Sequence, residues 1–199
     1  MSERIALPPP DELGGVPLWL ALGRRRSRRE FSGVRTLDWT QIGQLLWAVQ
    51  GASEPKDGLR TAPSAGALYP LEVDVALASG VYRYAPASHA LMQRDARDLR
   101  FALARAALDQ SWLAGAPCVF ALSGVSARTQ RKYGERAARY VHMEAGHAAQ
   151  NLLLAAVSIG LDAVPVGALD DDAVAHTLRL TSGEVPLYLL PVGWAGNPR

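Results

Sequence analysis

The amino-acid sequence predicts an α+β fold in a single domain. Helical and strand-like segments follow one another in an irregular order, and no internal repeat, domain linker or low-complexity tract interrupts them. The longest predicted element is a helix over residues 133–161, in which almost every residue from Ala148 to Ile159 is apolar. A helix that is apolar on all sides must be buried on all sides, so we expect it to cross the middle of the domain or a subunit interface.

The N-terminal third should contain an arm, two helices and a loop. Residues 1–16 include three successive prolines and are expected to form a flexible arm, so the domain proper spans 17–199. Pro17 predicts the first turn of a short helix over 17–26. Apolar residues at three- and four-residue spacing predict a second helix over 38–49, which Gly51 ends. Small residues and prolines predict a loop over 60–70.

The rest of the chain should supply the sheet and further helices. Short apolar runs bounded by turn residues predict strands at 71–77, at 81–84, around residue 91, at 118–122, at 163–166 and at 187–192. Helices are expected at 98–108 and at 170–180, where three aspartates favour the positive end of the second helix. Gly160 should end the long helix.

The composition indicates a globular cytoplasmic protein. The 199 residues are 49% hydrophobic and 20% charged, which suffices for one substantial core. No apolar run approaches the roughly 20 residues that cross a bilayer, and residues 1–12 lack the apolar centre of a signal peptide, so we expect no membrane contact. The one cysteine, Cys118, excludes an internal disulfide and is expected in a buried strand.

Five arginines within six residues form a compact cationic cluster from Arg24 to Arg29, with Ser27 as the one interruption. A guanidinium group grips two phosphate oxygens at once, and a serine hydroxyl with a backbone amide completes such a site. The alternative is a solvated charged face, in a chain with 21 Lys+Arg that strongly favours arginine. A nucleic-acid surface is disfavoured, because the net charge is only +2 and no second basic stripe is evident. The cluster favours the phosphate of a small molecule.

Two loops have small residues that would let the backbone approach a flat ligand. The first is 60–70, which Pro63 and Pro70 stiffen, and the second is 163–168, which follows the long helix. An ordinary strand-entry loop and a simple turn are the respective alternatives.

Other catalytic and binding motifs are absent or misleading. His142 and His147 lie five residues apart on the predicted helix, so they point to different faces and cannot hold one metal ion as an i, i+4 pair would. We therefore expect no metal site. The sequence contains no glycine-rich dinucleotide motif, no Walker lysine motif and no serine in a nucleophile elbow.

Taken together, five segments resemble the nitroreductase superfamily of FMN-dependent oxidoreductases over nearly the whole chain. The segments are Arg25-Arg26-Ser27-Arg28-Arg29, Ala62-Pro63-Ser64, residues 150–156, Pro165-Val166-Gly167 and Pro191-Val192-Gly193. Residues 60–72 and 132–147 are similar to the SagB-type dehydrogenase branch, whose studied members oxidise azoline rings to azoles in modified peptides. The resemblance implies a nitroreductase-like fold, with a central, mostly antiparallel sheet flanked by helices, and a homodimer with two FMN sites at the interface that buries the long helix.

The resemblance also implies roles for individual residues. The segment that holds the FMN phosphate and ribityl chain matches Arg25, Ser27 and Arg29, together with Arg26. The loop beside the flavin matches Pro63, Ser64 and Ala65. The turn whose backbone amide faces flavin N5 matches Val166 and Gly167, and Arg199 is the candidate for a terminal phosphate-binding residue. Ala67 and Gly167 stand where many nitroreductases have asparagine and glutamate, so backbone contacts are expected there.

Lys132 and Tyr133 match the Lys-Tyr pair that azoline dehydrogenases use beside the flavin, where either would remove a substrate proton. The alternative is a helix-start pair with Lys132 in solvent. Three functions stay open: an FMN-dependent oxidase of azoline or related amino-acid-derived substrates, an NAD(P)H-dependent nitro or quinone reductase, and a non-catalytic subunit of a modifying complex. The substrate is thus a small molecule or a peptide, and leader-peptide recognition would need a separate partner subunit.

Overall fold

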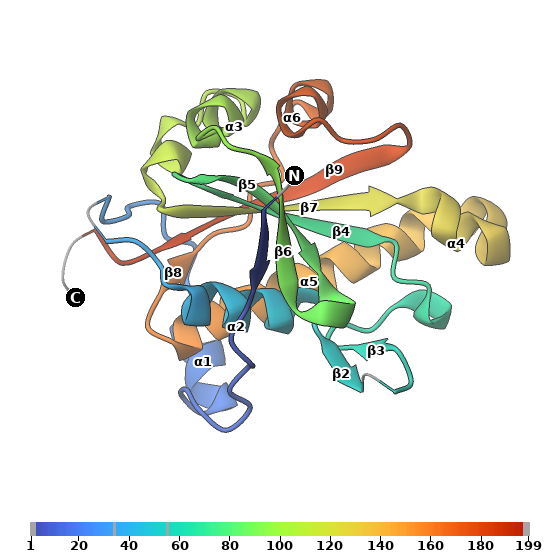
Figure 1. Ribbon diagram of the computed structural model, residues 1–199, viewed down its shortest axis with the longest axis horizontal. Helices are drawn as coiled ribbons and strands as arrows, with labels where there is room; N and C mark the ends of the chain where they lie inside the picture. Colours follow the sequence, from blue (N-terminus) through green and yellow to red (C-terminus); the bar gives the residue numbers. More distant parts are fainter. Residues whose placement is uncertain (1–2, 34, 55, 197–199) are drawn as a thin grey trace.

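The computed structural model describes residues 3–196 except 34 and 55. Within these residues the chain forms three layers, with an antiparallel sheet in the order β1-β6-β5-β4-β7-β9-β8 at the centre. Figure 1 shows α3 and α6 on one face of this sheet and α1, α2 and α5 on the other. The predicted α+β fold with an antiparallel sheet flanked by helices is confirmed.

The strands are β1 (Arg4–Ala6), β4 (Leu71–Leu77), β5 (Gly80–Ala85), β6 (Ala90–Asp95), β7 (Cys118–Val125), β8 (Asp162–Ala163) and β9 (Glu184–Gly193), with a separate hairpin of β2 (Ala52–Glu54) and β3 (Leu59–Arg60). The strands from β4 onward lie where the apolar runs predict them, whereas β1, β2 and β3 are not predicted. The strand expected at 163–166 is shorter, because Val166 pairs with Leu189 only in an isolated bridge. Cys118 is buried in β7, as predicted.

The helices are α1 (Leu18–Arg24), α2 (Trp39–Gln50), α3 (Arg100–Ala106), α4 (Ser126–Tyr133), α5 (Ala137–Ser158) and α6 (Asp171–Leu178). Short 3-10 turns cover Ala65–Ala67, Pro86–Ser88, Ser111–Gly115 and Gly134–Arg136. Asp38 and Gln41 form a reciprocal capping box that fixes the start of α2, and the Asp170 carboxylate accepts the Ala173 N–H at the start of α6. None of the helices described has the length and apolarity needed to span a bilayer.

The prediction of a single long helix over 133–161 is wrong at the N-terminal end of that helix. Two helices, α4 and α5, occupy this region, and the 3-10 turn at Gly134–Arg136 separates them. Gly134 adopts φ +53 and ψ −131, a conformation that is open to glycine and closed to most other residues, and it ends α4. Tyr133 is therefore the last residue of α4 and not the first residue of the long helix.

The N-terminal arm, expected to be flexible over 1–16, is instead bound to the sheet through part of its length. Residues 4–6 pair with residues 90–92 of β6, and the Leu7 N–H donates to the His89 carbonyl. The His89 ring bonds the Tyr84 hydroxyl at 2.8 Å and the Pro8 carbonyl at 2.9 Å. Backbone pairing to an edge strand thus holds this segment, a contact that its proline-rich composition does not predict.

The core consists of two clusters, one on each face of the sheet. Side chains of α2 and α5 pack against Val73, Val75, Phe120 and Leu122, while side chains of α3 and α6 pack against the opposite face through Val119 and Leu189. Helix α5 is not buried on all sides in one chain, because a stripe that includes Met143 and His147 is exposed. This stripe lies before residues 148–159, the apolar stretch from which burial is predicted, and within that stretch only Gln150 is exposed.

A buried ionic network joins the middle strands to β9. The Arg83 guanidinium donates to Asp74 at 2.5 Å and to Glu184 at 2.6 Å, and Glu184 also accepts the Ser123 hydroxyl at 2.5 Å. The side chains of Asp74 and Glu184 are only 1% exposed. Burial alone would lower the pKa of Arg83, but the hydrogen bonds and charges of these two carboxylates outweigh it and raise the pKa above its usual value.

Substitution of Arg83 by alanine should lower the free energy of unfolding by about 3 to 5 kcal/mol, because buried Glu184 then loses its cation and buried Asp74 keeps only Arg94. Urea unfolding at neutral pH measures this change. Arg97→Ala is the matched control, since Arg97 pairs with Asp95 on the exposed surface and should have little effect. Equal stabilities of the two variants would show that the Arg83 network does not hold the sheet together.

Candidate active site

The predicted site residues gather in two groups at opposite ends of α5. The arginine cluster and the turn with Val166 and Gly167 lie near the C-terminal end of the helix, where Gly15 approaches Ser158. The loop with Pro63, Ser64 and Ala65 and the pair Lys132-Tyr133 lie near its N-terminal half. Arg199, the predicted terminal phosphate ligand, lies outside the described residues.

Backbone pairing brings the arginine cluster to the Val166-Gly167 turn. Ser27 forms a parallel bridge with Ala163 of β8, and Phe31 forms an antiparallel bridge with Ala195. On the other side, Val166 and Leu189 exchange both backbone hydrogen bonds, at 2.8 and 3.0 Å. The segment from Ser27 to Phe31 is thereby fixed beside the sheet edge that carries the turn. The structure thus joins two motifs that are about 140 residues apart in the sequence.

The arginines of this cluster form no ion pair with any carboxylate in the described part of the chain. Arg26 donates to the carbonyls of Gly23 and Arg25, at 3.0 and 2.7 Å, and so closes the end of α1. Arg29 lies over the Trp112 ring at 5.7 Å. The remaining guanidinium groups have their donors available, and such an arrangement suits a phosphate group.

Tyr69 fixes the conformation of the loop over 60–70. Its N–H donates to the Ser64 hydroxyl at 2.9 Å, its hydroxyl accepts the Arg60 N–H at 3.0 Å, and its carbonyl accepts the Arg128 guanidinium at 3.1 Å. The Arg60 guanidinium also lies over the Tyr69 ring, at 4.6 Å. Tyr69 has φ +45 and Ala67 has φ +53, which are unfavourable conformations for residues with a side chain. Several contacts therefore hold a loop that would otherwise relax.

Lys132 and Tyr133 lie directly against this loop. A methyl group in place of the Gly66 hydrogen would lie 2.9 Å from both the Lys132 Nζ and the Tyr133 hydroxyl. Arg128 stands one turn earlier on α4 and bonds both the Tyr69 carbonyl and the Glu72 carboxylate, so it anchors α4 to the end of the loop. The alternative of a helix-start pair is wrong in position, since both residues close α4, but Lys132 is exposed, as that alternative expects. The structure brings the predicted catalytic pair and the predicted flavin loop together.

A buried polar network lies beneath the loop, and the sequence does not predict it. The Gln50 amide donates to Glu144 at 3.2 Å and accepts from Arg60 at 3.0 Å, and the Ser64 hydroxyl also bonds Glu144. Glu144 is 2% exposed. Burial raises the pKa of the Glu144 carboxyl, against the opposing hydrogen bonds from Ser64 and Gln50. The signal in the sequence is a single acidic residue on the otherwise apolar face of a helix.

The two groups of site residues cannot meet within one chain. Glu144, below the loop, and Ser158, near the arginine end, are fourteen residues apart on α5, which corresponds to about 21 Å along the helix axis. A rigid helix keeps this separation fixed. Within one protomer the two groups of predicted site residues therefore stay apart.

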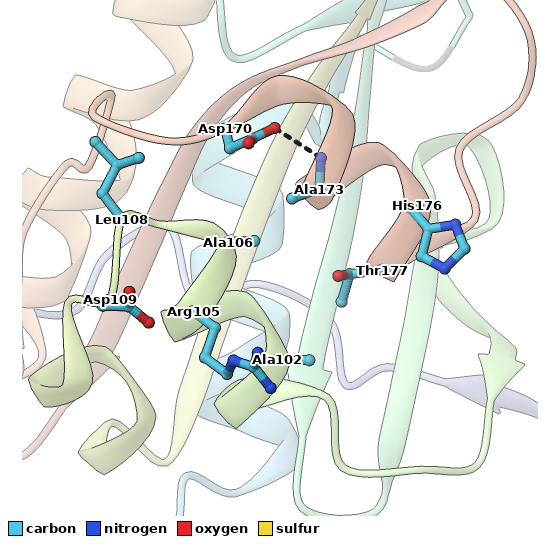
Figure 2. Close-up of a pocket in the computed structure, with 9 residues that line it drawn as sticks. All are labelled: Ala102, Arg105, Ala106, Leu108, Asp109, Asp170, Ala173, His176 and Thr177. Atoms are coloured by element: carbon cyan, nitrogen blue, oxygen red, sulfur yellow. Dashed lines mark hydrogen bonds between the residues drawn. The ribbon is translucent and has the colours of Figure 1, made fainter.

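A pocket of about 450 Å³ lies elsewhere, between α3 and α6. Figure 2 shows Arg105, Asp109, His176 and Thr177 around it, with alanines at its base and the Asp170 cap of α6 at one side. None of the predicted site residues lines it, and it opens on the face of the sheet opposite α5. The pocket therefore takes no part in the site described above.

Comparisons with known proteins give one consistent result. The pattern of the nitroreductase family matches residues 22–194. A protein of Methanocaldococcus jannaschii, provisionally named a nitroreductase, is 40% identical in an alignment 199 residues long that covers 97% of this chain and 98% of the relative. A crystal structure from Ralstonia eutropha, also provisionally described as a nitroreductase, has a TM-score of 0.87 at 32% identity and covers 98% of this chain and 90% of that chain.

The fold also occurs in a multi-subunit assembly. A chain of the E. coli microcin synthetase McbBCD complex, with truncated pro-MccB17 bound, has a TM-score of 0.76 and covers 94% of this chain and 76% of that chain. At 24% identity this likeness concerns the fold alone.

The Glu144 carboxyl makes stability depend on pH in a defined direction. Because burial raises its pKa in the folded protein, the stability that it contributes is complete below its ordinary pKa of 4.5 and is lost as the pH rises through the higher folded value. Glu144→Gln, which stays neutral, should therefore gain stability relative to the original protein between about pH 4 and about pH 8. Urea unfolding across this range tests the change, and a difference that is independent of pH would contradict it.

Proposed function

This chain belongs to the nitroreductase family of oxidoreductases, and on that premise we propose that it is an FMN-dependent enzyme that oxidises azoline or related amino-acid-derived substrates. The observation that carries the proposal is the contact of Lys132 and Tyr133 with Gly66, in the loop expected beside the flavin. A base next to a flavin loop suits removal of a substrate proton together with hydride transfer. A reductase that draws hydride from a nicotinamide needs no such base.

The cluster from Arg24 to Arg29, near the C-terminal end of α5, is called the arginine end. Its chemistry fits the phosphate of a flavin mononucleotide, and the family is flavin-dependent. Arg25, Ser27 and Arg29 offer donors without a competing carboxylate, and Arg26 holds the end of α1 from which they extend. Val166 and Gly167 lie beside them through the pairing of Ser27 with Ala163. Bound FMN would supply the hydride-accepting ring, and these residues would bind its phosphate and position its edge.

A second copy of the chain would complete the site. The exposed stripe of α5 is joined by apolar side chains of α1, where Leu18 and Trp19 are 58% and 82% exposed. Helix α1 packs on α5, so both surfaces are continuous. Two protomers related by a twofold axis would place the arginine end of one beside the Pro63–Ala65 loop of the other. The homodimer therefore explains both the exposed apolar surface and the separation of the half-sites.

At the loop end, the chain's own residues would manage the proton. Lys132 Nζ and the Tyr133 hydroxyl both lie in the space beside Gly66 that a side chain at this position would fill, so either atom is placed to take a proton from a substrate above the loop. The Tyr133 ring packs edge-on against Tyr140 at 4.9 Å, and this contact restricts its rotation. Arg128 keeps α4 in register with the loop.

An NAD(P)H-dependent nitro or quinone reductase is the second candidate. The provisional nitroreductase names of the Methanocaldococcus jannaschii relative and of the Ralstonia eutropha structure favour it. A role as one subunit of a modifying complex has support from the fold shared with the microcin synthetase assembly. In that case separate subunits would present a peptide substrate to this chain.

Purified protein should show the absorption bands of a bound flavin and should release FMN on denaturation.

With a thiazoline-containing peptide as substrate, Lys132→Ala and Tyr133→Phe should each lower turnover about 100-fold or more while the flavin stays bound, because each removes a proton acceptor. Unchanged turnover in both variants would remove the pair from the mechanism. Rapid bleaching of the flavin by NADPH, with efficient turnover of nitroarenes and none of azolines, would select the reductase instead.

A further inference from the structure

We propose that the substrate carries a carboxylate or a similar anionic group, which a cationic ridge beside the catalytic pair binds. The ridge consists of Arg131, Lys132, Arg136 and Arg139, at the end of α4 and the start of α5. The inference rests on the proposed function, since it concerns the substrate of that same site. It adds a chemical requirement that the proposed reaction does not itself impose.

The charge in this region is strongly one-sided. Residues 126–140 contain five basic side chains and one acidic side chain, Glu135. Arg128 is neutralised by Glu72. None of the four ridge cations forms an ion pair within the described residues. The ridge thus keeps a net positive charge, which the single acidic side chain of Glu135 offsets only in part.

Helix stability does not account for two of these arginines. Arg136 is the N-cap of α5 and Arg139 lies in its first turn, which holds no acidic residue. The N-terminal end of a helix carries a partial positive charge, so cations there are unfavourable. Arg131 and Lys132, by contrast, lie in the last turn of α4, where cations are favoured. The unfavourable pair therefore points to an anion that binds at this place.

Aromatic contacts connect the ridge to the catalytic pair. The Arg136 guanidinium lies over the Tyr140 ring at 5.6 Å and donates to its hydroxyl at 3.1 Å. Tyr140 packs against Tyr133, whose hydroxyl reaches Gly66. A continuous surface thus runs from Arg136 to the flavin loop. An anionic group of the substrate can bind on this surface while the reacting bond lies over the loop.

The preference of the ridge for an anionic group can be measured with benzoate and benzamide, two unreactive compounds of nearly equal shape. Titration calorimetry of the flavin-containing protein should show tighter binding of benzoate. Arg136→Gln together with Arg139→Gln should weaken benzoate binding roughly threefold to tenfold and leave benzamide binding unchanged, since two cations at the rim of a site contribute modestly. Salt near 0.5 M should reduce the benzoate preference by screening. Arg105→Gln, an exposed arginine on α3, is the matched control and should alter neither affinity.

Re-oxidation of the dithionite-reduced protein by 4-nitrobenzoate and by 4-nitrobenzamide gives a second readout. The reduced flavin passes two electrons and two protons to the nitro group, which yields a nitroso compound and water. In the variant with both Arg136→Gln and Arg139→Gln, the ratio of the re-oxidation rate with 4-nitrobenzoate to that with 4-nitrobenzamide should fall several-fold. Comparing this ratio between the variant and the unmodified protein removes the difference in intrinsic reactivity between the two compounds. Equal benzoate affinities in the variant and the unmodified protein would overturn the inference. Protein without bound flavin would instead count against the proposed function, while calorimetry would still decide the charge preference.

Discussion

The length and rigidity of α5 constrain every other feature of the site. The helix runs from Ala137 to Ser158 along one face of the sheet, with the arginine cluster at its far end and the Pro63–Ala65 loop near its beginning. Because backbone hydrogen bonds keep Glu144, below the loop, about 21 Å from Ser158, near the arginine cluster, no side-chain movement can join the two groups in one protomer. In the proposed homodimer, the exposed stripe on α5 and the apolar surface of α1 would lie where the second copy binds. In the proposed homodimer, contact between the two chains would therefore also complete the FMN site.

The half-site at the loop depends on buried polar contacts that order an unfavourable backbone. Tyr69 and Ala67 have positive φ values, which cost of the order of 1–3 kcal/mol each. Hydrogen bonds from Arg60 and Arg128 hold Tyr69, and Glu144 with Gln50 supports Ser64 and Arg60 from below. Such a loop is pre-organised, because its ligand need not supply the energy that orders it. The same rigidity keeps Lys132 and Tyr133 against Gly66, where a substrate proton would be removed.

The sequence predicts the parts of this structure that local patterns determine. Apolar runs locate β4 and β7, and the spacing of apolar residues after Asp38 locates α2, whereas its capping box appears only in the structure. The break between α4 and α5 is not predictable in this way, because a glycine inside a helical pattern is usually tolerated and Gly134 acts through its positive φ. The role of Glu144 depends on Gln50, which is 94 residues away in the chain, so no local pattern reveals it. For the candidate site, motif resemblance identifies Lys132, Tyr133 and Ser64, while only the folded chain shows that the first two contact the Ser64 loop.

The central claim is that each site combines the arginine end of one chain with the loop end of another. Co-expression of two defective chains tests it most directly: one with Arg25→Ala and Arg29→Ala, the other with Ala65→Trp to block the loop. In a mixed dimer one site receives both defects and the other receives none. The account predicts that each variant alone lacks FMN, whereas the purified mixed dimer binds about one FMN per two chains. A mixed dimer without FMN would contradict it, because the arginines and the loop would then act within the same chain.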